Sequence, residues 1–322
     1  MVLRELHPNL KLLSHNSQLT LHGCPRKFYL YRMLKKQLAE GIERGDIHTD
    51  FGGIVGYGCQ QLLTGSPRQK TMVEMLSKWR LELEEDTEKR QKKTFFHALH
   101  AVEKFENFLL ERLGNYELVQ LGEEGGEEPA IELGFEIDCG GGFSYRGLLD
   151  ALLVNKSNGN FAVWEGKTTS GRADEAMYRN SNQGLSYSVV VDAIAKRLGH
   201  PTGASYEVLY GVYKSVAEEW ELFPVKKNYV DRAMWIKSLL LDIERIQQYA
   251  DAELFPMHGE HCYNYFRQCE YFGVCNMSDT YLVGDSEKVE QLKEDDGKYF
   301  FKFTLDELVA AQLEKMELEL NL

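Results

Sequence analysis

Two acidic residues and one lysine flank a short polar turn in this chain of 322 residues. Asp150 belongs to the apolar run 147–154, and Glu165 and Lys167 end a second apolar run that begins at residue 161. The Asn- and Gly-containing stretch 155–160 between the two runs predicts a hairpin. In the register of that hairpin Asp150 faces Glu165, and like charges that face each other across strands destabilise a sheet. The pair therefore predicts a bound counter-ion.

The same residues carry a recognisable chemistry. Lys167 lies two positions after Glu165, so both side chains share one face of the predicted strand. Asp150, Glu165 and the Gly166 carbonyl supply the oxygen ligands that Mg²⁺ and Mn²⁺ prefer. A divalent cation held there would polarise a phosphate and lower the pKa of an attacking water, while Lys167 orients that water or offsets developing charge. The group predicts phosphodiester hydrolysis, and the alternative is a pair of surface acids beside an unrelated helix.

The order of these residues resembles the core of the PD-(D/E)XK nuclease superfamily, with Leu149 at the position where the motif carries proline. Further along the chain, Gln183 and Tyr187 resemble the QxxxY signature of the RecB-like branch. At this spacing the two side chains share one face of a helix. The resemblance implies that they hold the substrate strand or Lys167. It also implies an α/β, restriction-endonuclease-like core, in which helices flank a central mixed or antiparallel sheet.

Two further residues are candidates for the metal site. The Gly-rich segment 51–62 resembles the G-x3-H element of RecB-like nucleases, with Gly56 matched and Gln60 at the position of the histidine. That histidine contributes to the metal site in the family, so Gln60 is a possible metal ligand through its amide oxygen. Glu132 lies on the strand predicted at 131–137, where an acid approaches the site in RecB-like relatives. A solvated surface position is the alternative for Glu132.

The chain has six cysteines, and four of them form a pattern. Cys24 precedes a proline, which favours the first position of a helix and places the thiol at a helix N-terminus, where the dipole favours the thiolate. Cys262, Cys269 and Cys275 lie close together near the other end of the chain. We interpret the remaining two cysteines, at positions 59 and 139, as structural.

This split resembles the iron–sulfur RecB-like nucleases, a group that includes AddB-type and CRISPR-associated exonucleases and their phage relatives. In that group one N-terminal and three C-terminal cysteines hold a [4Fe–4S] cluster that joins the two ends of the domain. Cys24, Cys269 and Cys275 match the pattern, whereas Phe266 stands where the second C-terminal cysteine is usual. Cys262 would then reach the cluster through a longer loop. Zinc and buried unreactive thiols are the alternatives.

The charge and composition bear on partners and location. The net charge of −13 disfavours general attraction to DNA, but a binding groove needs only local positive potential. Basic and aromatic residues alternate near the N-terminus, which fits a single-stranded nucleic-acid groove; an amphipathic helix is the alternative. These residues are Arg26, Lys27, Phe28, Tyr29, Tyr31, Arg32, Lys35 and Lys36. We find no secretory signal and no apolar run as long as a membrane span, so we expect a soluble, cytoplasmic protein.

Periodicity predicts the remaining elements. Helices are expected at about 17–38, 71–113, 229–249 and 305–320, and strands at 206–213 and 220–225. Residues 1–280 are expected to form the nuclease domain, and residues 281–322 an acidic, helical C-terminal tail.

The resemblance implies a metal-dependent exonuclease acting on DNA ends, favouring single-stranded DNA, in recombination, repair or CRISPR-type processing. Any helicase partner would be a separate chain, since the sequence has no helicase motif. The alternative is a nuclease-fold module that binds DNA or a partner without cleavage.

Overall fold

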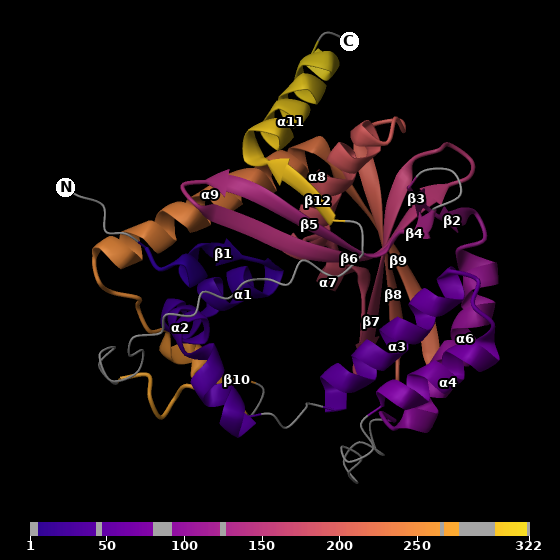
Figure 1. The fold of residues 1–322 in the computed structure, drawn as a ribbon, viewed down its shortest axis with the longest axis horizontal. Helices are drawn as coiled ribbons and strands as arrows, with labels where there is room; N and C mark the ends of the chain where they lie inside the picture. Colours follow the sequence, from indigo (N-terminus) through magenta and orange to yellow (C-terminus); the bar gives the residue numbers. More distant parts are fainter. Residues whose placement is uncertain are drawn as a thin grey trace.

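A mixed sheet with helices on both faces forms the body of the protein (Figure 1). The computed structural model describes residues 6–42, 47–79, 92–122, 127–264, 267–276 and 300–320. In this described part the main sheet has eight strands in the order β12-β5-β6-β7-β8-β9, with β1 and β2 both pairing with β6. The strands of this sheet are β1 (Leu12–Leu13), β2 (Tyr116–Leu118), β5 (Ile131–Gly140), β6 (Phe143–Asn155), β7 (Phe161–Thr169), β8 (Ser205–Lys214), β9 (Glu219–Asn228) and β12 (Phe300–Thr304).

Helices and two small hairpins complete the described elements. The helices are α1 (His15–Gly23), α2 (Pro25–Ile42), α3 (Ile47–Leu63), α4 (Arg68–Lys78), α6 (Phe95–Arg112), α7 (Glu175–Arg179), α8 (Asn182–Arg197), α9 (Tyr229–Asp251) and α11 (Leu305–Leu320). Short 3-10 turns occur at Pro8–Lys11 and Gly259–His261. The small hairpins pair β3 (Gln120–Leu121) with β4 (Glu128–Pro129), and β10 (Tyr263–Asn264) with β11 (Arg267–Gln268). No helix in the described ranges has the length and apolar composition needed to cross a membrane.

The expected hairpin register is confirmed. Val154 pairs with Phe161 and Leu152 with Val163, so the polar stretch 155–160 is the turn. After β7 the chain crosses over through α7 and α8 and returns as β8, which runs parallel to β7. The neighbouring pairs β5–β6 and β8–β9 are antiparallel, so the sheet is mixed, as expected.

Each face of the sheet has its own hydrophobic core. The first cluster packs between the sheet and helices α1, α2, α8, α9 and α11, and the second packs between the sheet and α3, α4 and α6. In Figure 1 the helices of the second cluster gather over the end of the sheet that holds β7, β8 and β9. Tight contacts occur within this cluster: a Cβ added to Gly211 on β8 would overlap the ring of Trp164 on β7. The missing side chain of Gly211 therefore allows Trp164 to pack directly against β8.

The single helix expected at 17–38 is wrong, because the chain forms two helices there. Cys24 ends α1 with an extended backbone (φ −152°), and Pro25 begins α2. Proline has no amide hydrogen to donate and so is suited to the first turn of a helix rather than to an interior position. Cys24 consequently lies at the start of α2, as expected, and its carbonyl accepts the amide of Phe28 at 3.0 Å.

The Gly-rich segment 51–62 lies inside α3, which begins four residues before it. A Cβ at Gly58 would come within 2.5 Å of Val102 on α6, so the missing side chain lets α3 and α6 approach closely. The helical pattern expected over 71–113 corresponds to α4 and α6, and residues 80–91 between them lie outside the described residues.

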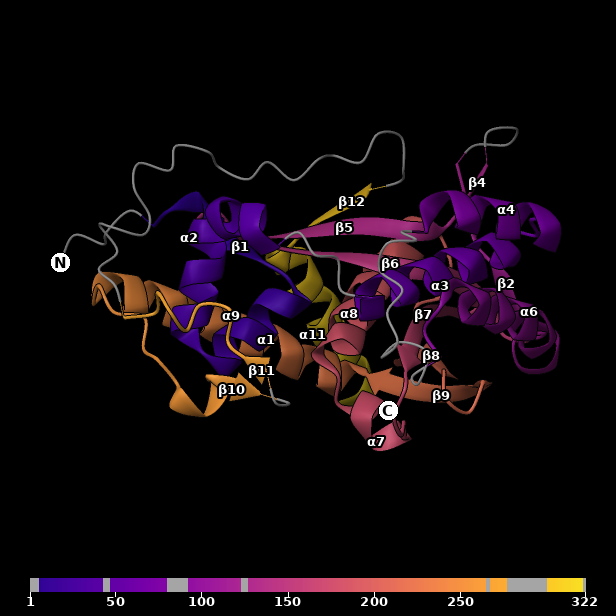
Figure 2. The ribbon, with the colours of Figure 1, turned by 90° about the horizontal axis from the view of Figure 1, so that it is seen from below.

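The C-terminal segment adds a strand and a helix to the body of the protein. β12 pairs parallel with β5 at the edge of the sheet, and Figure 2 shows the two strands side by side. Buried polar contacts attach α11 to α8 and α9. The Gln312 side chain accepts a hydrogen bond from Arg232 Nε at 2.8 Å and donates one to Asp192 at 3.3 Å. Lys315 also forms an ion pair with Asp192. The expected domain boundary at residue 280 lies outside the described residues.

Candidate active site

A change of strand facing sets the position of Asp150. On β6, Leu149 belongs to the first hydrophobic cluster and Ala151 to the second, although residues two apart on a regular strand share a face. The opposite strand β5 changes its facing at Glu132, whose φ of +46° is uncommon for any residue other than glycine. The β5–β6 register skips both residues, which lie opposite each other. Irregularities of this kind re-aim side chains beside active sites.

Beyond this point β6 separates from β7. Their pairing ends at Ala151 with Trp164, and the next step brings Asp150 beside Gly166. The Gly166 amide donates to Asp150 Oδ2 at 2.8 Å, so the carboxylate takes the place of a strand partner. The two expected acids therefore lie together at the point where the strands diverge.

Glu165, Lys167, Gln183 and Tyr187 form one hydrogen-bonded network. Lys167 Nζ donates to Glu165 Oε1 at 2.5 Å and to Gln183 Oε1 at 3.0 Å. The Gln183 amide donates to the same glutamate oxygen at 2.9 Å and to Tyr187 Oη at 2.7 Å. Tyr187 Oη donates in turn to the carbonyl of Leu148 at 2.8 Å. Helix α8 thus holds the strand residues, and the predicted i, i+4 pair shares one face as expected.

The pKa values of Asp150 and Lys167 differ from their ordinary values. Burial and the neighbouring Glu165 raise the pKa of Asp150 to about 7, although the Gly166 amide and Lys167 act in the opposite direction. Burial by itself lowers the pKa of Lys167, but Glu165 and Asp150 outweigh it and raise this pKa above its ordinary value. Lys167 is therefore a fixed cation at neutral pH rather than a proton acceptor. Clusters of perturbed groups of this kind are typical of functional sites.

The donor set fits an oxygen-seeking cation. Glu165 is 2% exposed, and its Oε2 atom is buried without a hydrogen-bond partner. A buried carboxylate oxygen needs a proton, a donor or a metal ion, and a cation beside Asp150 and Glu165 would offset the burial and the repulsion that raise the pKa of Asp150. Within the described ranges no group of three or more His, Cys, Asp or Glu side chains has the geometry of a metal site. A cation here would rely on two carboxylates and backbone oxygen.

A comparison with family models decides the relationship. The model described as PD-(D/E)XK nuclease superfamily matches residues 12–276, which is most of the chain. The chain belongs to the PD-(D/E)XK nuclease superfamily. A search of curated proteins gave no match. Membership in this superfamily supports a nuclease function and DNA as substrate, and its members usually use Mg²⁺ or Mn²⁺.

The candidates outside the superfamily core differ in their placement. Gln60 is 6% exposed on α3, and within the described residues its side chain makes no hydrogen bond to Asp150 or Glu165. Its neighbour Cys59 is close enough for Asp150 to raise the pKa of the thiol, in addition to the larger effect of burial. Gln60 thus follows a residue that lies close to Asp150, and its own side chain is not hydrogen-bonded to either acid. Glu132 lies opposite Asp150 and adds to the rise in the pKa of that carboxyl.

His15 is a residue of the site that the sequence did not indicate. It is the first residue of α1, and burial together with the nearby Lys167 lowers its pKa to about 4. Only the fold brings His15 near Lys167, 152 positions away in the sequence. His15 is neutral at physiological pH.

The four cysteines of the predicted cluster site lie in one region, where residues 258–276 meet α1 and α2, and within the described ranges they do not form a group with the geometry of a metal site. Cys262 and Cys269 lie opposite each other at the base of the β10–β11 hairpin, joined by a hydrogen bond from the Cys269 amide to the Cys262 carbonyl at 2.8 Å. Cys24 and Cys269 line one pocket of about 300 Å³ together with His261. Burial and the nearby thiols of Cys24, Cys262 and Cys269 raise the pKa of Cys275, and Arg26 lowers it.

The basic residues of the N-terminal helices serve mainly to attach neighbouring segments. Arg26 donates to the Cys275 carbonyl at 3.1 Å, and Lys27 donates to Glu270 at 3.1 Å. Arg32 is 8% exposed and contacts the Leu12 carbonyl. The side chains at positions 35 and 36 lie outside the described residues. Among the described residues, these contacts favour the amphipathic-helix interpretation over the nucleic-acid groove.

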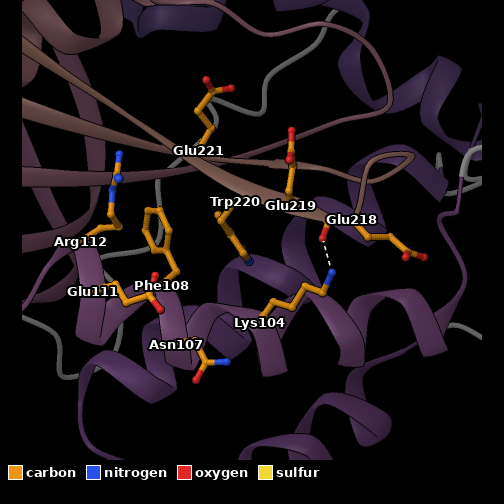
Figure 3. Close-up of a pocket in the computed structure, with 9 residues that line it drawn as sticks. All are labelled: Lys104, Asn107, Phe108, Glu111, Arg112, Glu218, Glu219, Trp220 and Glu221. Carbon is orange, nitrogen blue, oxygen red and sulfur yellow. Dashed lines mark hydrogen bonds between the residues drawn. The ribbon is translucent and has the colours of Figure 1, made fainter.

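A second pocket of about 360 Å³ lies between α6 and β9, and none of the motif residues lines it (Figure 3). Phe108 and Trp220 contribute aromatic surface, and Lys104 donates to the Glu218 carbonyl at 2.5 Å. Lys214 pairs with two of the lining acids, Glu219 and Glu221. Lys104, Glu219 and Glu221 therefore already have polar partners.

Proposed function

We propose that this protein is a Mg²⁺- or Mn²⁺-dependent exonuclease that hydrolyses phosphodiester bonds at DNA ends and favours single-stranded DNA. The supporting observation is the buried network in which Lys167 and Gln183 both hold one oxygen of Glu165, while its other oxygen has no partner. The same network extends through Tyr187 to the strand that carries Asp150. By resemblance, the setting is recombination, repair or CRISPR-type processing.

Each residue of the site has its own role in the proposed reaction. Asp150, Glu165 and the Gly166 carbonyl would hold the cation, which supplies Lewis-acid polarisation of the phosphate and a more acidic water. Lys167 stays protonated, so it orients the attacking water or stabilises negative charge on the phosphate rather than removing a proton. Gln183 fixes both Lys167 and Glu165, and Tyr187 fixes Gln183 relative to β6. This pre-positioning reduces the rearrangement required during the reaction.

We also propose that Cys24, Cys262, Cys269 and Cys275 hold a [4Fe–4S] cluster, with zinc as the alternative. The four thiols lie in one region, since Cys24, Cys262 and Cys269 all act to raise the pKa of Cys275, and this proximity supports the proposal. The expected result of anaerobic purification is a brown protein whose broad visible absorption is lost on Cys269→Ala and retained in Cys139→Ala. A colourless protein with one equivalent of zinc would contradict the iron–sulfur assignment.

A second candidate function is binding of DNA or a protein partner without cleavage. One observation favours it: Gln60 stands where the family carries its metal-site histidine, and within the described residues its side chain makes no hydrogen bond to Asp150 or Glu165. In that case Mn²⁺ would not change the thermal stability of the protein, with or without Asp150→Ala.

The deciding experiment is digestion of end-labelled linear and circular single-stranded DNA with Mn²⁺. We expect degradation of linear DNA only, loss of activity in Lys167→Ala, and full activity in Lys196→Ala, which removes an exposed lysine from α8. Cleavage of the circle would replace the exonuclease proposal by an endonuclease. No cleavage of either substrate by the anaerobically purified protein would support the binding module.

A further inference from the structure

A lysine occupies an inward-facing position of β9 that follows two apolar core residues. Phe223 and Val225 belong to the first hydrophobic cluster, and Lys227 continues the same two-residue spacing. Lys227 is 1% exposed, whereas the side chain of its neighbour Lys226 is 72% exposed. Burial lowers the pKa of Lys227 because it disfavours the charged form, and Asp231 acts in the opposite direction. A buried lysine costs folding free energy, which indicates a role that an apolar residue could not fill.

The ammonium group of Lys227 donates to the carbonyl of Arg179, the last residue of α7. The final carbonyls of a helix have no amide donor within the helix, and a lysine side chain can bind them. Helix α7 packs against β9, and Figure 2 shows the two elements side by side. No carboxylate among the described residues forms an ion pair with Lys227, so its ammonium group serves to hold this carbonyl.

The stem of Lys227 also reaches the other end of the turn that follows α7. A Cβ added to Gly184 on α8 would lie 3.5 Å from Lys227 Cε and 2.4 Å from the hydroxyl oxygen of Tyr210. The missing side chain of Gly184 therefore lets the lysine and the tyrosine approach the backbone of α8 closely. Lys227 thus lies against both ends of the segment 179–184.

This segment carries Gln183 into the candidate active site. Gln183 is the second residue of α8, and its side chain holds both Lys167 and Glu165. Ser181 precedes α8, but its side chain does not cap the helix. The start of α8 therefore depends on contacts from outside the helix. Lys227 supplies such a contact from a strand that is paired with β8 along its whole length.

We propose that Lys227 is a positioning residue for the nuclease reaction: its ammonium group fixes the turn between α7 and α8 and thereby holds Gln183 against Lys167 and Glu165. This inference rests on the proposed nuclease function. Lys227 belongs to the same sheet as Glu165, since β9 pairs with β8 and β8 with β7. A group on such a rigid element positions its neighbours more precisely than a group on a loop. Small displacements of positioning groups lower reaction rates strongly.

A double-mutant cycle separates positioning from stability. Lys227→Met keeps an unbranched side chain and removes the ammonium group, and Lys226→Met is the matched control on the exposed face of β9. On linear single-stranded DNA with Mn²⁺, we expect Lys227→Met to lower kcat by about 10- to 100-fold with KM within about twofold, and the control to match wild type. In a Gln183→Ala background the same substitution should lower kcat by less than about twofold, because the side chain it positions is absent. An equal loss in both backgrounds would overturn the proposal, since Lys227 would then act independently of Gln183.

Urea denaturation in EDTA checks that the compared variants are folded, and Lys227→Gln enters the cycle if Lys227→Met does not fold. A second readout requires no activity: the side-chain amide signal of Gln183 in ¹⁵N NMR spectra, assigned by its loss in Gln183→Ala. This signal should shift in Lys227→Met and keep its position in Lys226→Met, and an unchanged signal in Lys227→Met would also overturn the proposal. If the wild type does not cleave DNA, the nuclease proposal fails, whereas the NMR result still decides whether Lys227 holds Gln183.

Discussion

Replacing Asp150 by asparagine should stabilise the protein when no metal is present. In the folded protein burial and Glu165 raise the pKa of this carboxyl from 3.8 to about 7, so ionising it at neutral pH costs folding free energy. The shift of about 3 units corresponds to about 4 kcal/mol, taking 1.36 kcal/mol per unit. Asparagine removes the charge, and its side-chain oxygen can still accept the Gly166 amide.

The direction of the pKa shift determines how the stability difference between Asp150→Asn and wild type changes with pH. A raised folded-state pKa means that the folded protein binds a proton more tightly than the unfolded chain. The penalty is therefore absent below pH 3.8, grows as the pH rises to about 7, and is constant above that value. The advantage of Asp150→Asn over wild type should grow by about 1.4 kcal/mol per pH unit between pH 5 and pH 7.

Urea denaturation in EDTA at pH 5, 6, 7 and 8 measures this advantage. With Mn²⁺ added, the wild type should become more stable than Asp150→Asn. A cation offsets the repulsion between Asp150 and Glu165, and only the wild type has that repulsion. The matched control is Asp138→Asn, which removes a carboxylate from the far end of β5. A variant that is less stable than the wild type at every pH, or an advantage that does not change with pH, would refute the reasoning.

Three other substitutions test the packing and the network. Gly211→Ala should destabilise the fold by about 1–3 kcal/mol in urea denaturation, because the new methyl group overlaps Trp164; Gly53→Ala, with no atom within 4 Å of the added Cβ, is the control. Asp192→Ala should lower the free energy of unfolding by about 3–5 kcal/mol in the same measurement, because Arg232 and Lys315 lose their buried carboxylate partner. A decrease below about 1 kcal/mol would contradict the role of Asp192 in attaching α11. Tyr187→Phe should reduce kcat on single-stranded DNA about tenfold, because Gln183 and Leu148 lose a hydrogen-bond partner worth about 1 kcal/mol; an unchanged kcat would remove the tyrosine from the positioning network.

The local sequence pattern was sufficient to predict the hairpin formed by β6 and β7. A polar turn between two apolar runs allows one register that keeps the apolar residues inside, and the structure has Val154 opposite Phe161 in that register. The predicted register holds as far as Ala151 opposite Trp164, and beyond this pair the strands diverge, so that Asp150 lies beside Gly166 instead of directly opposite Glu165. The i, i+4 spacing likewise placed Gln183 and Tyr187 on one face of α8.

Features that depend on contacts between distant parts of the chain could not be predicted from the sequence. The change of facing at Glu132 arises because β5 and β6 pass from one hydrophobic cluster to the other, and no local pattern records that switch. β12 is five residues long and pairs with a strand about 165 positions earlier, so its apolar residues alone do not identify it. His15 approaches Lys167 only through the packing of α1. The basic residues near the N-terminus suggested DNA, but their partners are segments at the other end of the chain.

The most direct test of the central claim is Mn²⁺-dependent cleavage of linear single-stranded DNA by wild type, Glu165→Gln and Glu207→Gln. Glu165 holds the buried oxygen that lacks a partner, whereas Glu207 accepts the Tyr116 hydroxyl at the far end of the sheet. The account predicts cleavage by wild type and Glu207→Gln, none in EDTA, and a loss of at least about 100-fold in Glu165→Gln. Equal cleavage by Glu165→Gln and wild type would contradict it.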